Sequence, residues 1–483
     1  MENDNLTGKS FIKKLIGFST ASWISAAISL MATPLITRMF TPSEVGKINL
    51  FSTFMVLFQT ISILGLDQAF MRFYNEPPNS INKKSLLGLC MSVSISMSVL
   101  CSLVMLIAYS TISIEITGKE NFFVIICLII TVFSSVALRM TSIASRMEQK
   151  IGSYTIQTIS ISLIEKVIFV LVAFYRANHI YAITAISFSY LFVAILFLIV
   201  KRNSIQIDLK IKKDAIKQIL YFAIPYTPVL LLSWLNNSIP QFILKRYVDY
   251  GAIGIYTNAV SIANILSIIQ TGFNVYWAPF VYENYKSNKR KVIKVHQLIT
   301  AILIIAAVGI VLTQDVIYLL LGERFRGSRL VFPFLLLSPI SNSISDTTGV
   351  GIMLSKKSYL NIFSFLGSAC VNIIISILLV PKFGILGASI AAGFASIMML
   401  IIRTYIGSKF YRLSKNYNYL FFSFLILLIV ASINVIFSNN IIVRNFLFVG
   451  CLAIIFFIYS REFLYLFNFA KKEVKALLGG GRK

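Results

Sequence analysis

Charged side chains occur inside apolar stretches of this sequence, where contact with lipid would be costly. Glu165 and Lys166 are adjacent in the middle of one apolar run, and Asp346 lies in another, "SPISNSISDTTGVGIML". A charge near the centre of a bilayer costs about 2.5–3.5 kcal/mol on insertion scales, so such groups usually face a cavity or a partner. Two interpretations therefore stay open for each group: coupling or binding within a transport cavity, or a structural contact between helices.

Three more charged residues lie close to the ends of predicted helices. They are Asp67, Arg72 and Arg139. Such residues can anchor a helix at the membrane interface, or they can lie at the entrance of a cavity. We treat Asp67 as a candidate for coupling or gating, and Arg72 and Arg139 as candidates for binding an anionic substrate.

A proline-rich apolar run, "IPYTPVLLLSWLNNSIPQF", combines polar amides with possible kinks. Asn236 and Asn237 are candidate cavity residues. Pro225 and Pro228 remove backbone hydrogen bonds and permit bending. We expect this segment to act as a gate.

Signals for catalysis are absent from the sequence. Its two histidines, His179 and His296, have no partner cluster, and the five cysteines show neither metal-ligand nor disulfide-framework spacing. No phosphate-binding glycine loop followed by Lys and Ser or Thr occurs. We therefore expect no catalytic residue, no metal and no cofactor, and an energy source other than direct use of ATP.

The composition is that of an integral membrane protein. Of the 483 residues, 57% are hydrophobic and 13% are charged, whereas a soluble domain has about a quarter charged. The net charge of +26 could suggest nucleic acid, but the Lys and Arg residues fall in short clusters between apolar runs. That placement is typical of loops beside a membrane, so we expect a bilayer partner and no nucleic acid.

Runs of about 20 apolar residues predict an all-α polytopic fold with about fourteen transmembrane helices. We expect an N-terminal six-helix lobe (1–200), a basic cytoplasmic linker (201–218), a C-terminal six-helix lobe (219–407), and two extra helices with a basic tail (408–483). Lys and Arg are roughly three times as frequent in alternate loops, which predicts that both termini are cytoplasmic. The predicted spans are about 15–37, 47–70, 85–109, 121–141, 154–175, 180–200, 219–243, 252–279, 297–314, 330–353, 359–380, 384–407, 418–437 and 441–466.

The two predicted lobes echo one another in sequence. Arg38 and Gly46 align without gaps on Arg246 and Gly254, 208 positions later. Each pair spans the end of one apolar run and the start of the next. Related halves in a polytopic protein are typical of transporters whose pathway lies between the halves.

Three segments carry a family resemblance: "TRMFTPSEVGKINLF" (37–51), "GLDQAFMRFYNE" (65–76) and "PKFGILGASIAAGFAS" (381–396). Together with the length and the helix count, they resemble the bacterial polysaccharide or O-antigen flippases. These belong to the multidrug/oligosaccharidyl-lipid/polysaccharide exporter superfamily. The first predicted span holds no charge between Lys14 and Arg38, unlike the arginine-rich first helix of the related peptidoglycan-precursor flippases.

The resemblance implies two lobes around a central cavity in the bacterial inner membrane. It also implies a substrate, an oligosaccharide linked by pyrophosphate to a polyprenyl carrier, which alternating access moves from the cytoplasmic to the periplasmic face. Polysaccharide polymerase and chain-length machinery are the further partners it suggests. Basic residues would bind the pyrophosphate, and the candidates are Arg38, Arg72, Arg139, Lys166 and Arg246.

Two alternatives remain. A multidrug or cation antiporter of the same superfamily would share the fold but favour an acidic cavity. A membrane polymerase or transferase of lipid-linked sugars would need a sizeable extracytoplasmic loop with catalytic residues, and the longest predicted outer loop, near 314–329, is short.

Overall fold

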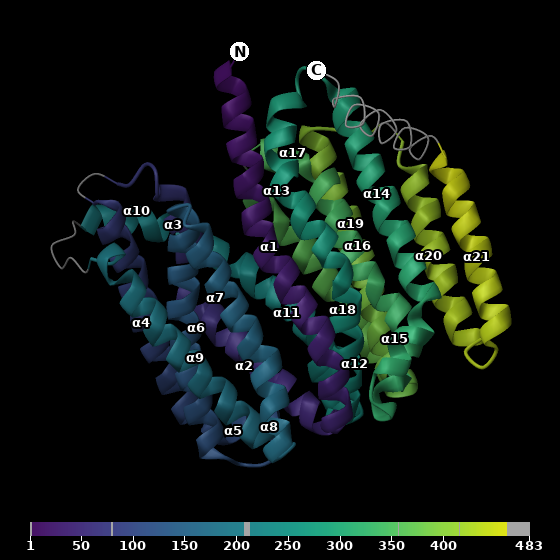
Figure 1. Cartoon of the computed structure of the whole chain (residues 1–483), viewed down its shortest axis with the longest axis horizontal. Coiled ribbons are helices and arrows are strands. Elements are labelled where there is room, and N and C mark those ends of the chain that lie inside the picture. The colour runs from purple at the N-terminus through teal and green to yellow at the C-terminus, as the bar shows by residue number, and fades with distance from the viewer. Residues whose placement is uncertain (1, 79–80, 207–212, 356, 415, 461–483) are drawn as a thin grey trace, which may run out of the picture. The chain divides into compact units, whose positions relative to one another are not determined.

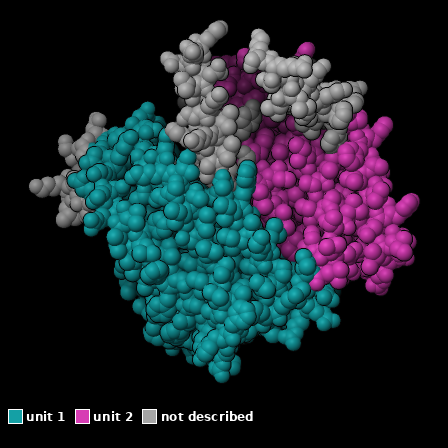
Figure 2. Space-filling model, viewed as in Figure 1, with its two compact units in different colours: residues 1–258, 320–326, 361–391 teal, residues 259–319, 327–360, 392–483 magenta. Residues whose placement is uncertain are grey.

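The computed structural model describes residues 2–78, 81–206, 213–355, 357–414 and 416–460, and the regular structure in these ranges is helical (Figure 1). Contacts divide the chain into two compact units (Figure 2). Unit 1 comprises residues 1–258, 320–326 and 361–391, and unit 2 comprises 259–319, 327–360 and 392–483. These units are defined by contacts, whereas the two six-helix lobes are predicted from the sequence repeat. The lobes therefore stay a prediction.

Among the described residues, twelve helices are long and apolar enough to cross a membrane. The number is thirteen if a pair of helices bent by 49°, α2 (Pro42–Ile63) and α3 (Leu66–Phe73), forms one span. The predicted span at 330–353 falls on α16 (Phe332–Thr348), which has 17 residues and is shorter than a typical span. The all-helical polytopic prediction is confirmed. Residues 207–212 of the predicted linker lie outside the described residues. So do the end of the predicted last span (461–466) and the predicted tail that follows it, while most of that span is α21.

Unit 1 is organised around α6, the most enclosed of the candidate spans: 61% of its 18-residue apolar stretch is buried. The helices α4 and α9 pack on α6, α1 packs on α7 and α8, and α11 packs on α2 and α18. The bounds are α1 (Glu2–Met39), α4 (Lys83–Ile107), α5 (Tyr109–Thr117), α6 (Phe122–Met147), α7 (Ile151–Leu163), α8 (Phe169–Tyr175), α9 (His179–Lys201), α10 (Lys213–Ala223), α11 (Tyr226–Tyr247) and α18 (Asn361–Phe383).

Unit 2 is organised around contacts of α14 with α13, α16 and α21, and of α20 with α16 and α21. The residues of α12, α15 and α19 are each assigned partly to unit 1 and partly to unit 2. The bounds are α12 (Tyr250–Ala263), α13 (Ser267–Asn284), α14 (Lys289–Leu312), α15 (Gln314–Leu320), α17 (Val350–Leu354), α19 (Ile385–Phe410), α20 (Asn418–Ile436) and α21 (Ile441–Ile458).

The start of α2 is fixed by its local sequence. The Thr41 side chain accepts a hydrogen bond from the Glu44 backbone N–H (3.4 Å), and Pro42 occupies the first helical turn. A threonine cap, a proline whose φ suits the first turn and an acidic residue near the helix N-terminus all favour initiation here. This short polar turn therefore places the first residues of α2 reproducibly.

The starts of α2 and α12 meet through glycines at equivalent repeat positions. A methyl group at Gly46 would lie 1.9 Å from the Tyr250 carbonyl oxygen, and one at Gly254 would lie 2.0 Å from the Pro42 carbonyl oxygen. Pro42 and Tyr250 are themselves 208 positions apart, so the contact is reciprocal. We call these four residues the glycine seam. Backbones approach this closely only where a side chain is missing.

The neighbouring connections repeat the same exchange. The Gly322 backbone N–H donates to the Thr37 hydroxyl (3.0 Å), and the Tyr250 hydroxyl donates to the Ile114 carbonyl (2.9 Å). Ile114 and Gly322 are again 208 positions apart. These two hydrogen bonds therefore join each connection to a segment distant in sequence, beside the glycine seam.

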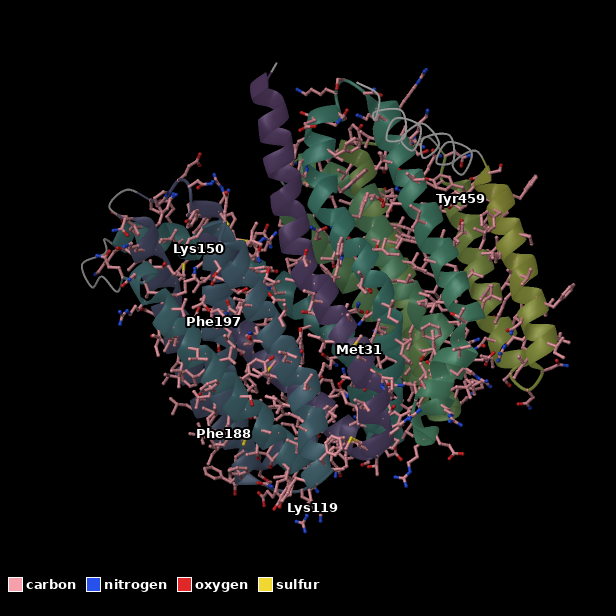
Figure 3. All side chains as sticks on the ribbon, in the orientation of Figure 1. Met31, Lys119, Lys150, Phe188, Phe197 and Tyr459 are labelled. Carbon is pink, nitrogen blue, oxygen red and sulfur yellow. The ribbon has the colours of Figure 1, made fainter. Side chains whose placement is uncertain are left out.

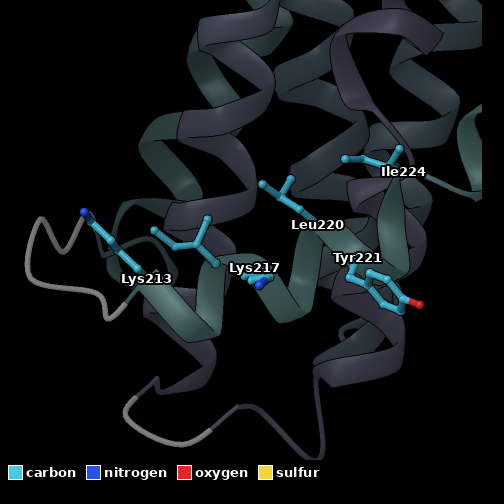
Figure 4. A pocket seen from close by; sticks show the side chains of 6 residues that line it. Lys213, Lys217, Leu220, Tyr221 and Ile224 are labelled. Atoms are coloured by element: carbon cyan, nitrogen blue, oxygen red, sulfur yellow. The ribbon is translucent and has the colours of Figure 1, made fainter.

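The helix α10 is amphipathic and lies partly within the predicted linker (Figure 4). Its buried residues Ala215, Ile219 and Ala223 belong to the core cluster that includes α3. Lys217 and Tyr221 lie on the outer side, beside a surface groove along the helix. Lysine and tyrosine on one side of a short amphipathic helix suit the membrane–water interface.

Two lysines of unit 1 lie at opposite ends of α6 (Figure 3). Lys119 precedes α6 and Lys150 follows it, and the exposed Phe188 of α9 lies between these two levels. An apolar zone between two charged ends is the pattern expected of helices that cross a bilayer.

A buried lysine closes one of these ends. Lys201 is 2% exposed, and its Nζ lies 2.7 Å from the Glu148 carboxylate, which Lys150 also reaches at 2.9 Å. Burial opposes ionisation of Glu148, but hydrogen bonds from Lys201 and Lys150 outweigh it, so the pKa of Glu148 is lowered. This ion pair ties the end of α6 to the end of α9.

We predict that Gly46→Ala and Gly254→Ala each lower the thermal stability of the purified protein in detergent. The new methyl groups collide with backbone oxygens, and overpacking of this kind costs about 1–3 kcal/mol. Gly152→Ala and Gly309→Ala are matched controls, since a methyl group at either helical position meets no atom within 4 Å. Equal melting temperatures for the seam variants and these controls would contradict the assigned contact.

We predict that Glu148→Gln destabilises the protein by about 2 kcal/mol, because it leaves the buried Lys201 amine without a carboxylate. The wild-type contribution is present at neutral pH and is lost as the pH falls through the lowered pKa of Glu148 in the folded protein. Melting temperature measured between pH 7 and pH 4 checks both points. Lys150→Gln, at a side chain that is 60% exposed, should change the stability by no more than about 0.5 kcal/mol.

Candidate functional site

Asp67 and Arg139 form an ion pair within unit 1. Asp67 of α3 is 4% exposed, and its Oδ2 accepts from Arg139 Nη2 of α6 at 2.8 Å. The Gln68 backbone N–H donates to the other carboxylate oxygen at 2.9 Å. The arginine side chain is 49% exposed, so its guanidinium compensates a buried carboxylate while staying accessible from one side.

Asp346 also carries an arginine partner, in unit 2. Its Oδ1 accepts from Arg403 Nη1 of α19 at 2.7 Å, and its Oδ2 accepts from the Gln270 amide of α13 at 3.2 Å. Arg403 Nη1 also donates to the Ser345 hydroxyl at 3.2 Å. Each of the two side chains, Asp346 and Arg403, is 24% exposed. The sequence singled out Asp346 but did not predict Arg403 or Gln270 as its partners.

The hydroxyl groups around Asp346 are mostly turned into the protein. Ser343, Thr347 and Thr348 are buried and donate to carbonyl groups of their own helix. Thr348 also hydrogen-bonds to Thr404 of α19 at 2.6 Å. These three hydroxyl groups therefore make hydrogen bonds within the protein. Asn342, on the same helix, is exposed.

Glu165 and Lys166 lie in a π-helical turn, Ile164–Ile168, between α7 and α8. Glu165 accepts a 2.6 Å hydrogen bond from the Tyr190 hydroxyl of α9. Within the described part of the chain, the Lys166 side chain makes neither a hydrogen bond nor an ion pair, while its backbone carbonyl accepts from the Phe169 N–H. Single π-turns inside α-helices occur frequently at functional sites, because the extra residue redirects neighbouring side chains.

The remaining basic candidates lie at helix ends. Arg38 donates from Nε to the Leu320 carbonyl at 3.1 Å, beside the seam. Arg246 is exposed and stacks over Tyr247. Arg72 pairs with Glu76 one turn later in an exposed ion pair at 3.1 Å. These contacts place the three side chains, but they assign none of them to a cavity.

The two candidate asparagines of α11 have different surroundings. Asn236 is held by α18, since the Asn372 amide donates to its carbonyl at 2.9 Å and the Ser368 hydroxyl donates to its side chain at 3.2 Å. Asn237 is exposed and lines a groove. Pro225 is the residue before α11 and Pro228 lies in its first turn, so a gating role for them stays a prediction.

A groove of about 360 Å³, most of whose lining residues have polar side chains, lies between α2 and α11 within unit 1. Trp234 Nε1 donates to the Thr53 carbonyl at 2.9 Å, and the Thr53 hydroxyl lies 2.9 Å from Gln241 Oε1. The volume is within the range of small-molecule sites, about 300–1,000 Å³. The groove is lined by Asn49, Ser52, Thr53, Val56, Thr60, Leu230, Ser233, Trp234, Asn237, Ser238 and Gln241.

Of these groove residues, the sequence analysis predicted only Asn237. The available signal was a polar stripe along an apolar helix: Asn49, Thr53 and Thr60 recur at helical spacing on α2, and Trp234, Asn237 and Gln241 do so on α11. Neutral polar residues are less conspicuous than charges in an apolar run. Their meeting also depends on how the two helices pack.

Comparison with known proteins adds a family and a fold. The sequence matches the family described as polysaccharide biosynthesis protein over residues 11–279. A search of curated proteins gives no match.

Several solved structures share the fold. One is the lipid II flippase MurJ in an inward closed conformation, with a TM-score of 0.69 and 14% identity, covering 92% of this chain and 99% of the other. Another is an inward-facing multidrug resistance MATE family transporter of the MOP superfamily. Its TM-score is 0.55 with 15% identity, covering 80% of this chain and 94% of the other. The family and the shared fold point to a transporter rather than an enzyme. The chain, a multi-pass membrane protein, belongs to the polysaccharide biosynthesis protein family.

Proposed function

We propose that this transporter is a flippase for a polyprenyl-pyrophosphate-linked oligosaccharide, such as an O-antigen unit or a similar surface polysaccharide unit. It moves the sugar headgroup from the cytoplasmic to the periplasmic face of the bacterial inner membrane by alternating access, while the lipid tail stays in the bilayer. The observation that carries the proposal is the family match across more than half of the chain. The fold shared with a lipid II flippase supports it.

The arrangement of charges favours a lipid-linked sugar over a cationic drug. An exporter of cations needs carboxylates that can attract a positive ligand. Asp67 and Asp346 each already pair with an arginine, and Glu165 accepts a hydrogen bond from the Tyr190 hydroxyl. Lys166 has no carboxylate partner in the described ranges, and a charge in a span needs a partner or water. Lys166 and the accessible Arg139 are therefore the preferred residues for binding a pyrophosphate.

The orientation proposed for the flippase follows the positive-inside rule. The excess of Lys and Arg in alternate loops supports cytoplasmic termini. In that orientation the glycine seam lies near the periplasmic end, because it follows the outward-running α1 and α11. Polysaccharide polymerase and chain-length machinery, which act on the delivered unit, are the proposed functional partners.

Deletion of the gene tests the proposed function. We expect loss of surface polysaccharide and accumulation of complete lipid-linked units on the cytoplasmic face, measured by lipid extraction and by accessibility to a membrane-impermeant sugar-oxidising reagent. Lipid-linked units that reach the periplasmic face but stay unpolymerised would instead indicate a polymerase or transferase. Unchanged polysaccharide with new sensitivity to cationic drugs would indicate an antiporter.

We predict that Arg139→Asp slows flipping of a lipid-linked sugar in reconstituted vesicles by tenfold or more, on the order of 1.4 kcal/mol. The double variant Asp67→Arg/Arg139→Asp separates two roles of the pair. Restored flipping would mean that only the ion pair matters. Restored thermal stability without flipping is the result expected if Arg139 also binds the pyrophosphate. Glu76→Gln, in the exposed pair, is the control and should flip at the wild-type rate.

A further inference from the structure

We propose that the groove between α2 and α11 binds uncharged sugar rings of the transported headgroup, with Trp234 as the stacking surface. This inference rests on the proposed flippase function and specifies the ligand of one site within it. Nine of the eleven lining residues are polar or aromatic, the other two are Val56 and Leu230, and none carries a formal charge.

The chemistry of the lining matches a ligand rich in hydroxyl groups. Amide and hydroxyl side chains both donate and accept hydrogen bonds, as sugar hydroxyls do. A pyrophosphate or a uronic acid would need a basic residue, and a cationic drug would need an acidic one. The groove offers neither, so a neutral polyol is the ligand class that it complements.

Trp234 is held in a fixed orientation. Its Nε1–H donates to the Thr53 carbonyl of α2 at 2.9 Å, and its ring lies 6.1 Å from the Phe242 ring at an interplanar angle of 63°. Phe242 in turn contacts the Phe54 ring edge-on at 5.8 Å. Because the indole N–H is already satisfied, the ring contributes an apolar surface, and a rigid aromatic surface binds with little loss of side-chain entropy.

Hydrogen-bonding capacity remains beside that ring. Asn237 is exposed, and its amide nitrogen donates to the Ser233 carbonyl at 3.0 Å. Its side-chain oxygen accepts no hydrogen bond from the described residues. The Gln241 oxygen accepts from Thr53, while its amide nitrogen donates to none of the described residues. A ring stacked on Trp234 would meet an acceptor at Asn237 and a donor at Gln241, one helical turn apart on the same side of α11.

The groove begins where the glycine seam ends. Asn49 lies three residues after Gly46 on α2, within one helical turn. A ligand in the groove would therefore contact the same helix whose start is fixed at the seam. Polar side chains at this depth also avoid the cost of facing lipid, since a groove that admits water or sugar satisfies them.

The test measures binding of three defined lipids to the purified full-length protein in detergent. The probes are a short-chain polyprenyl pyrophosphate carrying a neutral disaccharide, the same lipid carrying a uronic-acid disaccharide, and the sugar-free lipid. We expect the neutral-sugar lipid to bind most tightly. Trp234→Ala and Asn237→Ala should each weaken its binding by about tenfold, with less than twofold change for the sugar-free lipid. Trp234→Phe should restore most of the affinity.

Two controls keep the result interpretable. Trp23→Ala removes an exposed tryptophan of α1 and should leave all three affinities unchanged. Asn237→Ala changes an exposed side chain, so it reports on the groove even if Trp234→Ala fails to fold.

Each outcome separates the groove from the flippase. Wild-type binding of sugar lipids that both groove variants leave unchanged would overturn the groove assignment and keep the proposed function. An equal loss for the sugar-free lipid, or a preference for the uronic-acid lipid, would also overturn it. If the wild-type protein binds no sugar-bearing lipid, both the flippase proposal and the groove assignment fall.

Discussion

The reciprocal contact between the starts of α2 and α12 constrains how closely these two helices can pack. Two backbones meet at Gly46 and Gly254 with no room for a methyl group on either side. In lipid, the hydrophobic effect gives little drive for helix association, so close backbone packing and hydrogen bonds must supply it. The exchange of Thr37 with Gly322, and of Tyr250 with Ile114, adds those hydrogen bonds at both sides of the contact.

The polar side chains of the membrane-spanning region are accommodated in two different ways. The acids Asp67 and Asp346 are neutralised in place by arginines from another helix. The amides and hydroxyls of α2 and α11 instead line a shared groove. Pairing offsets the cost of a buried carboxylate, whereas a groove without charges keeps hydrogen-bonding capacity for a ligand. The two arrangements show that charged and neutral polar groups are accommodated differently within the same membrane-spanning region.

The sequence predicted the membrane class, the helical architecture and nearly all spans, because apolar length alone determines them. It also located the equivalent glycines, since the echo between the halves is visible at Arg38–Gly46 and Arg246–Gly254. It could not find the Arg403 partner of Asp346 or the meeting of Thr53 with Trp234. Those contacts depend on helix rotation and packing, which short-range spacing does not encode. Asn236 and Asn237 show the limit well: neighbours in sequence, they lie about 100° apart on a helix, and one binds α18 while the other lines the groove.

The pairing of Asp67 with Arg139 and of Asp346 with Arg403 has an electrical consequence. Each pair carries no net charge, so moving it through the field of an energised membrane involves almost no electrical work. A lone lysine such as Lys166 is different, because displacing one charge across 100 mV involves about 2.3 kcal/mol. A rearrangement that moves these two pairs therefore involves little electrical work, whereas displacing an unpaired charge such as Lys166 or Glu165 across the membrane would make the cycle sensitive to voltage.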